Sequence, residues 1–310
     1  MPTTITSVTD GGRTTVSDLT GAPLAIPARV IDMLAGASIV EELLRDAGGN
    51  TNGLVSFEES TPLFLDGDVA TVAEFGEILV AAGQRGIPRI SVGLKEALAI
   101  RVSREMRDEN RMDQVNTQLR QLVNTMTRAE LRALRALLLN PAIPTIPASA
   151  AWDTPGARIR HDLFAAEEII ASAKPNTGQE DDTYSFEADT VAMHGGLKPL
   201  LLDNDEFLAI YKDALSEENP VYTGVLPRTI GGKRGLTSRF WPRDRVLVTE
   251  AKTLGFWSDT RPLESTPLYG EGGGPNGGPT ESWRSDTSRK RVLGVDQPLA
   301  ACWITGVRSQ

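Results

Sequence analysis

One long amphipathic segment constrains the fold of this 310-residue chain more than any other feature. Residues 111–140 predict a single helix, about 45 Å long at 1.5 Å per residue, that ends before Pro141. Its apolar residues recur at spacings of three and four positions: Val115, Leu119, Leu122, Met126, Ala129, Ala133 and Leu137. The opposite side carries a polar, mostly basic stripe: Arg120, Asn124, Arg128, Arg132 and Arg135. This stripe is either a solvated helix face or a contact surface for nucleic acid or an acidic partner segment.

The chain before this helix divides into three parts. Residues 1–25 are rich in Thr, Ser and Gly and have no apolar period, so we expect an arm that must lie on something else. A helix is predicted from Pro27 to about Leu44, with Gly48 and Gly49 placed beyond its end where a left-handed cap is favoured. Residues 53–102 are rich in Val, Ile, Phe and Leu and are punctuated by Gly and Pro, which predicts extended structure.

An acidic block lies within the extended segment. Its members are Glu58, Glu59, Asp66, Asp68, Glu74 and Glu77. No basic residue occurs from Asn52 to Gln84. Gly67, Gly76 and Gly83 make this segment a poor rigid platform for catalysis, so a solvated or partner-facing loop is expected.

The second half of the chain mixes helix and strand patterns after a proline-punctuated linker over residues 141–155. A helix with Pro155 near its first turn is marked by Ile159, Leu163, Ala166, Ile170 and Ala173. Asp203 and Glu206 resemble a capping box in front of a further helix from Phe207. Strands are predicted for RVLVTEAK, TLGFWSD, RKRVLGVD and PLAACWITGV, with a loop of Gly and Pro over residues 270–278. The expected fold class is α+β.

Charge and cysteine content limit the classes of function. A formal net charge of -9 and a pI near 5.0 argue against a dedicated nucleic-acid binder, although local basic patches remain compatible with them. Cys302 is the single cysteine, so no intrachain disulfide forms, which fits assembly in a reducing cytoplasm. The N-terminus has no signal-peptide pattern, and no segment approaches the ~20 apolar residues of a membrane span.

The motifs of common enzymes fail at specific positions. Gly232-Lys233 superficially suggests a phosphate-binding loop, but Pro227 stands where Gly is needed and Arg234 where Ser or Thr is needed, so a turn between strands is expected. His161 and His194 are the only histidines, and neither belongs to HExxH or accompanies a GxSxG elbow. The residues supply no ligand set for a metal and no cofactor motif. A carboxylate-dependent hydrolase stays open, because carboxylates are plentiful.

The parts of this chain follow in the order known from tailed-phage capsid proteins: an arm without a core of its own, a long acidic extended segment, a very long helix and a mixed remainder. The run ISVGLKEALAIRVSREMRDENRMDQVNTQLRQLVN resembles the exit of the E-loop into the spine helix of the Hong Kong ninety-seven shell fold. The run VYTGVLPRTIGGKRGLTSRFWPRDRVLVTEAKTLGFWSD, with its continuation to residue 307, is similar to capsid proteins of phages that infect actinobacteria. The resemblance covers residues 50–308 and is most specific in the C-terminal third.

The resemblance implies a division of the chain. The expected parts are an N-terminal arm and helix (1–50), an E-loop (51–92), a P-domain with the spine helix (93–150), an A-domain (151–254), a P-domain hairpin with the Gly-rich loop (255–296) and a C-terminal strand (297–310). Too few residues precede the first helix for a built-in scaffolding segment, so a separate scaffolding protein is expected. In some family members an E-loop lysine forms an isopeptide bond with an asparagine of a neighbouring subunit. Lys95 is the first lysine in this sequence, so this cross-link is not expected.

The implied function is that of a major capsid protein, not an enzyme. It assembles with itself as pentamers and hexamers into an icosahedral shell around double-stranded DNA, in the host cytoplasm, together with a portal and, in some phages, decoration proteins. An encapsulin-like compartment of the same fold, which packages protein cargo, is the alternative. No membrane partner and no cofactor is implied.

The predicted contacts between subunits are of two kinds. The acidic block of the E-loop is expected to face arginines of a neighbouring subunit near the start of the spine: Arg101, Arg104, Arg107 and Arg111. The resemblance places Gly273 and Gly274 near local three-fold axes, where glycine lets backbones approach closely.

Overall fold

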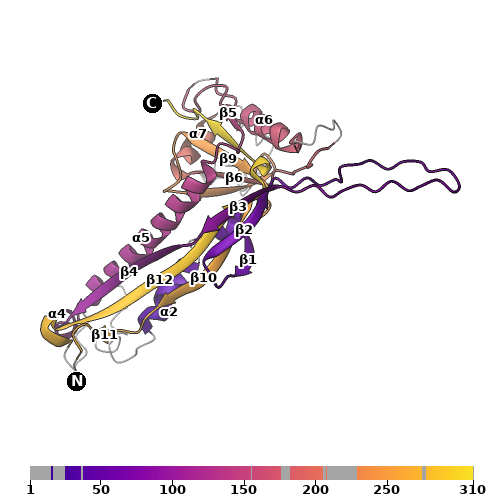
Figure 1. Ribbon diagram of the computed structural model, residues 1–310. Helices are drawn as coiled ribbons and strands as arrows, with labels where there is room; N and C mark the ends of the chain where they lie inside the picture. Colours follow the sequence, from indigo (N-terminus) through magenta and orange to yellow (C-terminus); the bar gives the residue numbers. More distant parts are fainter. Residues whose placement is uncertain are drawn as a thin grey trace.

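The computed structural model places the chain in two main sheets, a set of helices and one long projection (Figure 1). It describes residues 15–16, 25–35, 38–154, 156–175, 182–204, 207, 229–273 and 277–309. Most of the predicted arm, together with Pro155, Glu206 and Gly274, lies outside the described residues.

The first sheet is organised around one long strand, β12. Its members are β1 (Arg45–Gly49), β4 (Leu94–Ser103), β10 (Gly255–Ser265), β11 (Tyr269–Gly270) and β12 (Ser282–Val295). β12 pairs antiparallel with β4, β10 and β11, while β1 joins β10 in parallel. The two strands expected on either side of the Gly-rich loop are thus present as β10 and β12, whereas the assignment of this pair to a P-domain stays a prediction.

The predicted long helix is confirmed as α5 (Met112–Leu138), which runs along the first sheet (Figure 1). Its apolar side forms a core with α2 (Ala25–Ala35) and β4, in which Val115, Leu119 and Val102 are buried. The short helix α4 (Arg104–Asp108) connects β4 to α5, and the Ser103 hydroxyl caps it by accepting a hydrogen bond from the Met106 amide at 3.2 Å.

The second sheet combines segments from the middle and the end of the chain. Its order is β5 (Thr145–Pro147), β13 (Ala301–Thr305), β9 (Arg245–Thr249), β6 (Thr190–His194), β8 (Lys233–Ser238) and β7 (Thr229–Ile230). α6 (Ile159–Ala171) packs on it, and α7 (Lys198–Asp203) follows the single 3-10 turn after β6. The C-terminal strand lies between β5 and β9, so the expected boundary at residue 150 falls after the first strand of this sheet.

Both faces of the second sheet are buried, because its strands alternate between two cores. Val246 and Val248 of β9 pack with Ile159 and the rest of the α6 side. Leu247 between them packs with Trp303 and Leu134, at the C-terminal end of α5. The long helix therefore packs against both sheets, against the first with Val115 and Leu119 and against the second with Leu134.

The remaining strands, β2 (Leu54–Glu59) and β3 (Ile87–Val92), form a separate antiparallel hairpin. Residues 60–86 between them extend far from both sheets (Figure 1) and are called the projection below. A single bridge pairs Leu65 with Gly83. The prediction of extended structure over 53–102 is correct for β2, β3 and β4, whereas residues 60–86 form no regular strand.

The single helix predicted from Pro27 to Leu44 is wrong. α2 ends at Ala35, a short α3 (Val40–Leu43) follows, and Leu44 already has extended backbone. Gly48 and Gly49 form no helix cap but belong to β1, because the open edge of β10 offers backbone partners to this segment. Gly48 does adopt the left-handed backbone, with φ of 79°.

Two details at helix ends also differ from the sequence prediction. α6 begins at Ile159, four residues beyond Pro155. Asp203 is the last residue of α7 and not a cap, while the Asn204 side chain accepts a hydrogen bond from the Phe207 amide at 2.9 Å. Except for Phe207, the helix predicted from that residue onward lies outside the described residues.

Candidate assembly surfaces

The projection exposes apolar side chains to an unusual degree. Val69 and Val80 are each 96% exposed and Phe75 is 99% exposed. Further exposed apolar residues of this segment are Leu63, Phe64, Leu65, Val72, Ile78 and Leu79. Exposed apolar side chains gathered on one segment make the projection a candidate contact surface.

The base of the projection is fixed to the rest of the chain. Phe57 packs edge-on against Phe256, with 5.1 Å between ring centroids. The Ser60 amide donates to the Asp296 carbonyl at 2.8 Å, and the Tyr184 hydroxyl donates to the Ser60 carbonyl at 3.0 Å. These contacts fix the direction in which the projection leaves the sheets, whereas its far part lies away from both sheets (Figure 1).

Two of the predicted acidic contact residues are engaged at this base. Glu59 is only 4% exposed and accepts a hydrogen bond from the Arg89 guanidinium at 2.5 Å. Glu58 accepts from the Gly86 amide at 3.3 Å. The lack of basic residues holds from Asn52 to Gln84, but Arg85 lies at the end of the projection and Arg89 on β3. Asp66, Asp68, Glu74 and Glu77 are exposed.

The arginines predicted to receive these carboxylates lie at the opposite end of the first sheet, near α4 and β11 (Figure 1). Within one chain the structure does not bring the two sets together. Each arginine already has an intrachain partner: Arg101 pairs with Glu271 at 2.5 Å, Arg104 with Glu281 at 2.9 Å, Arg107 with Asp108 at 3.1 Å, and Arg111 with Glu109. Their contact with another subunit stays a prediction.

The Gly-rich tip of the β10–β12 hairpin has a backbone that only glycine adopts easily. Gly273, Gly277 and Gly278 have φ of 66°, 83° and 71°. A Cβ at Gly277 would lie 2.5 Å from the Ser282 amide nitrogen, so a larger residue cannot replace it without a shift of the backbone. The hydrogen bond from Arg101 holds the pKa of Glu271 below its ordinary value. The hydrogen bond from Tyr269 does the same for the pKa of Asp286.

A buried ionic cluster joins α5 to the first sheet. Glu130, 5% exposed, accepts hydrogen bonds from Arg289 at 3.0 Å and from Arg291 at 2.9 Å. Arg289 also reaches Glu96, and Arg291 reaches Asp259. Burial lowers the pKa of Arg291, but Asp259 and the charge of Glu130 outweigh that effect and raise it. This cluster was not predicted from the sequence. Its only sign there was the spacing of Arg289 and Arg291, which puts both arginines on one face of a strand.

The residues considered for enzyme chemistry have structural partners. Gly231 and Gly232 form the turn between β7 and β8, as predicted, and Lys233 pairs with Glu167 at 2.6 Å. His194 ends β6 and accepts a hydrogen bond from the Gly196 amide at 2.8 Å, while burial and the nearby Arg243 lower its pKa. Over the described ranges, no three His, Cys, Asp or Glu residues gather as a metal site.

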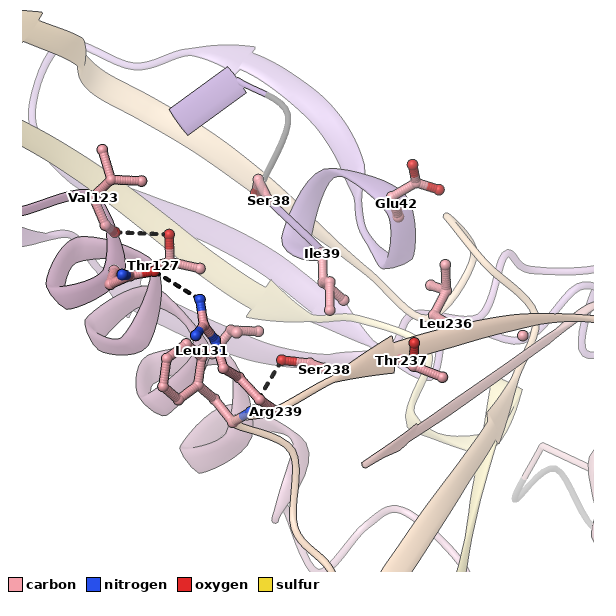
Figure 2. Close-up of a pocket in the computed structure, with 13 residues that line it drawn as sticks. Ser38, Ile39, Glu42, Val123, Thr127, Leu131, Leu236, Thr237, Ser238 and Arg239 are labelled. Carbon is pink, nitrogen blue, oxygen red and sulfur yellow. Dashed lines mark hydrogen bonds between the residues drawn. The ribbon is translucent and has the colours of Figure 1, made fainter. Parts of the chain in front are cut away.

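One open cleft of about 380 Å³ lies where α5 meets α3 and the end of β8 (Figure 2). Val123, Thr127 and Leu131 of α5 face Ser38 and the residues from Leu236 to Arg239 across it. Among the described residues, Glu42 is the only acid that lines the cleft, so it holds no pair of facing carboxylates. No described histidine, cysteine or lysine lines it either, so it offers no Ser-His or Cys-His arrangement. No helix in the described part of the chain has the length and apolar character to cross a membrane.

Solved structures with this arrangement define the class of fold. The capsid of the cyanophage P-SCSP1u matches with a TM-score of 0.61 at 13% identity, over 88% of this chain and 89% of its own. A structure of Microbacterium phage Oxtober96 matches at 0.58 and 15% identity, over 86% and 90%. The virus-like particle of Pyrococcus furiosus matches at 0.55 and 12% identity, over 90% and 97%. The chain has the phage capsid fold, as its resemblance predicted.

The sequence itself carries the family. A family model described as phage capsid protein matches residues 91–293, well over half of the chain. The chain belongs to this family of phage capsid proteins. No curated protein matches it in sequence.

Proposed function

We propose that this chain is the major capsid protein of a tailed phage, a structural subunit that forms pentamers and hexamers in an icosahedral shell around double-stranded DNA. The observation that carries the proposal is the projection, whose apolar side chains have nothing to cover them within the chain. Since burial of apolar area is the main favourable term in association, another copy of the chain is the natural cover. Obligate contacts of this type typically bury more than about 2,000 Å².

The contact chemistry of the projection combines two contributions. An exposed ion pair adds only about 0–1 kcal/mol, and the arginines near α4 already have partners within the chain. Burying one large apolar side chain adds about 1.5–3 kcal/mol. We therefore infer that Phe75 and its apolar neighbours supply most of the affinity, and that Glu74 and Glu77 select the register of docking.

The Gly-rich tip supports a contact around an axis. Gly273 has an open surrounding and a left-handed backbone, which lets neighbouring backbones approach without side chains between them. We place this tip at a local three-fold axis, with Gly274 beside it in the sequence. A shell structure with Gly273 farther than one subunit width from every three-fold axis would refute this placement.

The remaining partners follow from the same proposal. A scaffolding protein directs assembly in the host cytoplasm, a portal occupies one vertex, and the finished shell is part of the virion. Decoration proteins bind the outside in phages that have them.

The test is electron microscopy of the purified chain together with analysis of the particle contents. Closed shells that protect double-stranded DNA from nuclease support the proposal. Shells that hold a protein instead support an encapsulin-like compartment, a second candidate that the likeness to the Pyrococcus furiosus particle favours. A compact monomer by light scattering under all assembly conditions contradicts both and favours a hydrolase.

A further inference from the structure

The exposed side of α5 carries arginines that lack ion-pair partners. Arg120, Arg128, Arg132 and Arg135 are all exposed, and none forms a salt bridge in the described part of the chain, although the charge of Arg135 acts on Asp244. Several arginines of the first sheet differ, since Arg101, Arg284 and Arg289 each hold at least one acidic partner. In a chain of net charge -9, an unneutralised row of positive charge indicates a negatively charged partner.

Within the row of arginines, α5 itself contributes no exposed carboxylate. From Gln114 to Leu138 the only acid is Glu130, and its carboxylate is buried on the other side of α5 with Arg289 and Arg291. From Thr117 to Arg132, the exposed residues other than the arginines are polar and uncharged: Thr117, Gln121 and Asn124. We call the exposed arginines together with these three residues the arginine face.

The second sheet adds a further guanidinium to the arginine face, because Arg239 directly follows β8 of that sheet. Arg239, from the loop after β8, crosses the cleft to α5 and donates to the Asn124 amide oxygen at 2.7 Å (Figure 2). Ser38, Thr127, Thr237 and Ser238 line the same cleft with hydroxyl groups. Arg, Asn, Gln, Ser and Thr are the side chains that contact phosphate oxygens of nucleic acid without reading its sequence.

We infer that the arginine face lines the inside of the shell and binds the phosphate backbone of packaged double-stranded DNA. The inference rests on the proposed function, because only a DNA-filled shell brings duplex DNA to this surface. The row from Arg120 to Arg135 spans about 22 Å of helix. Duplex DNA presents a phosphate charge about every 1.7 Å of its axis, so a rod of DNA along α5 meets every arginine of the row.

The acidic projection of a second copy is the competing occupant, and its chemistry fits less well. Its carboxylates alternate with exposed apolar residues such as Val69, Phe75 and Val80, which need an apolar surface to bind. The centre of the arginine face offers none, because its exposed side chains from Thr117 to Arg132 are polar or charged. DNA requires only charge and hydrogen-bond donors.

The first test measures DNA binding by unassembled full-length subunits, with a fluorescent duplex of about 30 base pairs at several salt concentrations. Each phosphate contact contributes about 0.9 to the slope of log affinity against log salt. Arg128→Gln with Arg132→Gln should reduce this slope by about two. The matched control, Arg158→Gln with Arg160→Gln, removes two exposed arginines near the start of α6 and should leave the slope unchanged.

An unchanged slope in the face variant, or an equal loss in the control, overturns the inference. So does a face variant that stops forming shells yet binds DNA as the parent chain does, because the face then contacts another copy. Electron microscopy of the same proteins keeps the two claims apart. If the parent chain forms shells while the slopes overturn the inference, the proposed function stands; if no protein forms shells, the proposed function fails.

The second test locates the face in the assembled shell. Gln121→Cys places a thiol in the arginine face, and a maleimide carried on a polymer too large to enter the shell should label free subunits but spare intact shells. The native Cys302 stays silent, because it is buried in β13 and burial raises the pKa of its thiol to about 11. Equal labelling of shells and free subunits puts the face outside and overturns the inference.

Discussion

The α5 region and the projection are both elongated and both rich in charge, but they find their partners in different places. Glu130 on α5 lies within hydrogen-bonding distance of two arginines of β12, and the apolar side of the helix is buried against β4 and α2. In the projection, Glu74, Glu77 and Phe75 are exposed and have no such neighbours. One region is complete within the chain, and we propose that the other becomes complete only between chains.

The difference teaches how to separate folding from assembly in this protein. A change in the buried cluster should act on the stability of the subunit, whereas a change in the projection should act on the shell alone.

Loss of Glu130 should have the largest effect on stability. Glu130→Ala leaves Arg289 and Arg291 buried with one fewer counter-charge, which should destabilise the subunit by about 3 kcal/mol. Urea unfolding of unassembled subunits at pH 7 measures this. The matched control, Glu74→Ala in the projection, should change the unfolding free energy by less than about 0.5 kcal/mol. Equal effects of the two changes would remove the distinction between the regions.

Phe75→Ser should leave the subunit stable and weaken the shell. Phe75 contacts almost nothing in the isolated chain, so its unfolding free energy should stay within about 0.5 kcal/mol of the parent. If the ring is buried between subunits, each contact loses about 2 kcal/mol. Light scattering across a concentration series should show assembly shifted to higher concentration. Assembly at the parental concentration would leave the apolar surface without its proposed role.

Charge reversal in the projection should lower the affinity between subunits less than Phe75→Ser does. Its larger effect should be on the register in which the projection docks on a neighbouring subunit. Glu74→Arg with Glu77→Arg should impair assembly, and reversal of Arg104 and Arg107 to Glu should restore it if these residues meet. At 1 M salt the Debye length falls to about 3 Å, so ionic contacts weaken while apolar ones hold or strengthen. Shells indifferent to the first change would rule out the pairing.

Acid should loosen the tip of the β10–β12 hairpin before the rest of the sheet. The pKa values of Glu271 and Asp286 are held below their ordinary 4.5 and 3.8, so their contribution is fully present above those values and is lost as pH falls through the lower folded pKa values. Hydrogen exchange, corrected for intrinsic rates, should rise at residues 269–273 below about pH 4.5. The amides of β13 serve as the control, and equal loosening there would point to global unfolding.

No covalent ladder should form through the projection. Residues 51–94 contain no lysine, and an isopeptide bond needs an amine nucleophile. Shells boiled in denaturant should therefore release monomers on a gel. Covalent multimers with Lys95 or a later lysine in the linkage would contradict this.

Local patterns predicted the elements whose packing is itself local. The three- and four-residue spacing along α5 identified the helix, its exposed arginines and the buried side of its first half. In its second half the spacing missed Leu131, Leu134 and Leu138, which are buried because the second sheet covers another side of the helix there. The runs that became β9, β10, β12 and β13 were also identified. The helix from Pro27 failed, since β1 depends on the edge of β10, more than 200 residues away in the sequence.

The sequence by itself determined the order of elements, the acidic and apolar character of the projection, the arginine stripe and the family resemblance. Only the tertiary structure decided which charges are already paired. Glu59 with Arg89, Arg101 with Glu271 and Glu130 with β12 depend on side chains brought together by strand register, and charge counted along the chain does not contain that register. The same reason explains why the sequence could not tell the exposed arginines of α5, which form no salt bridge in the described part of the chain, from Arg101 or Arg289, which do.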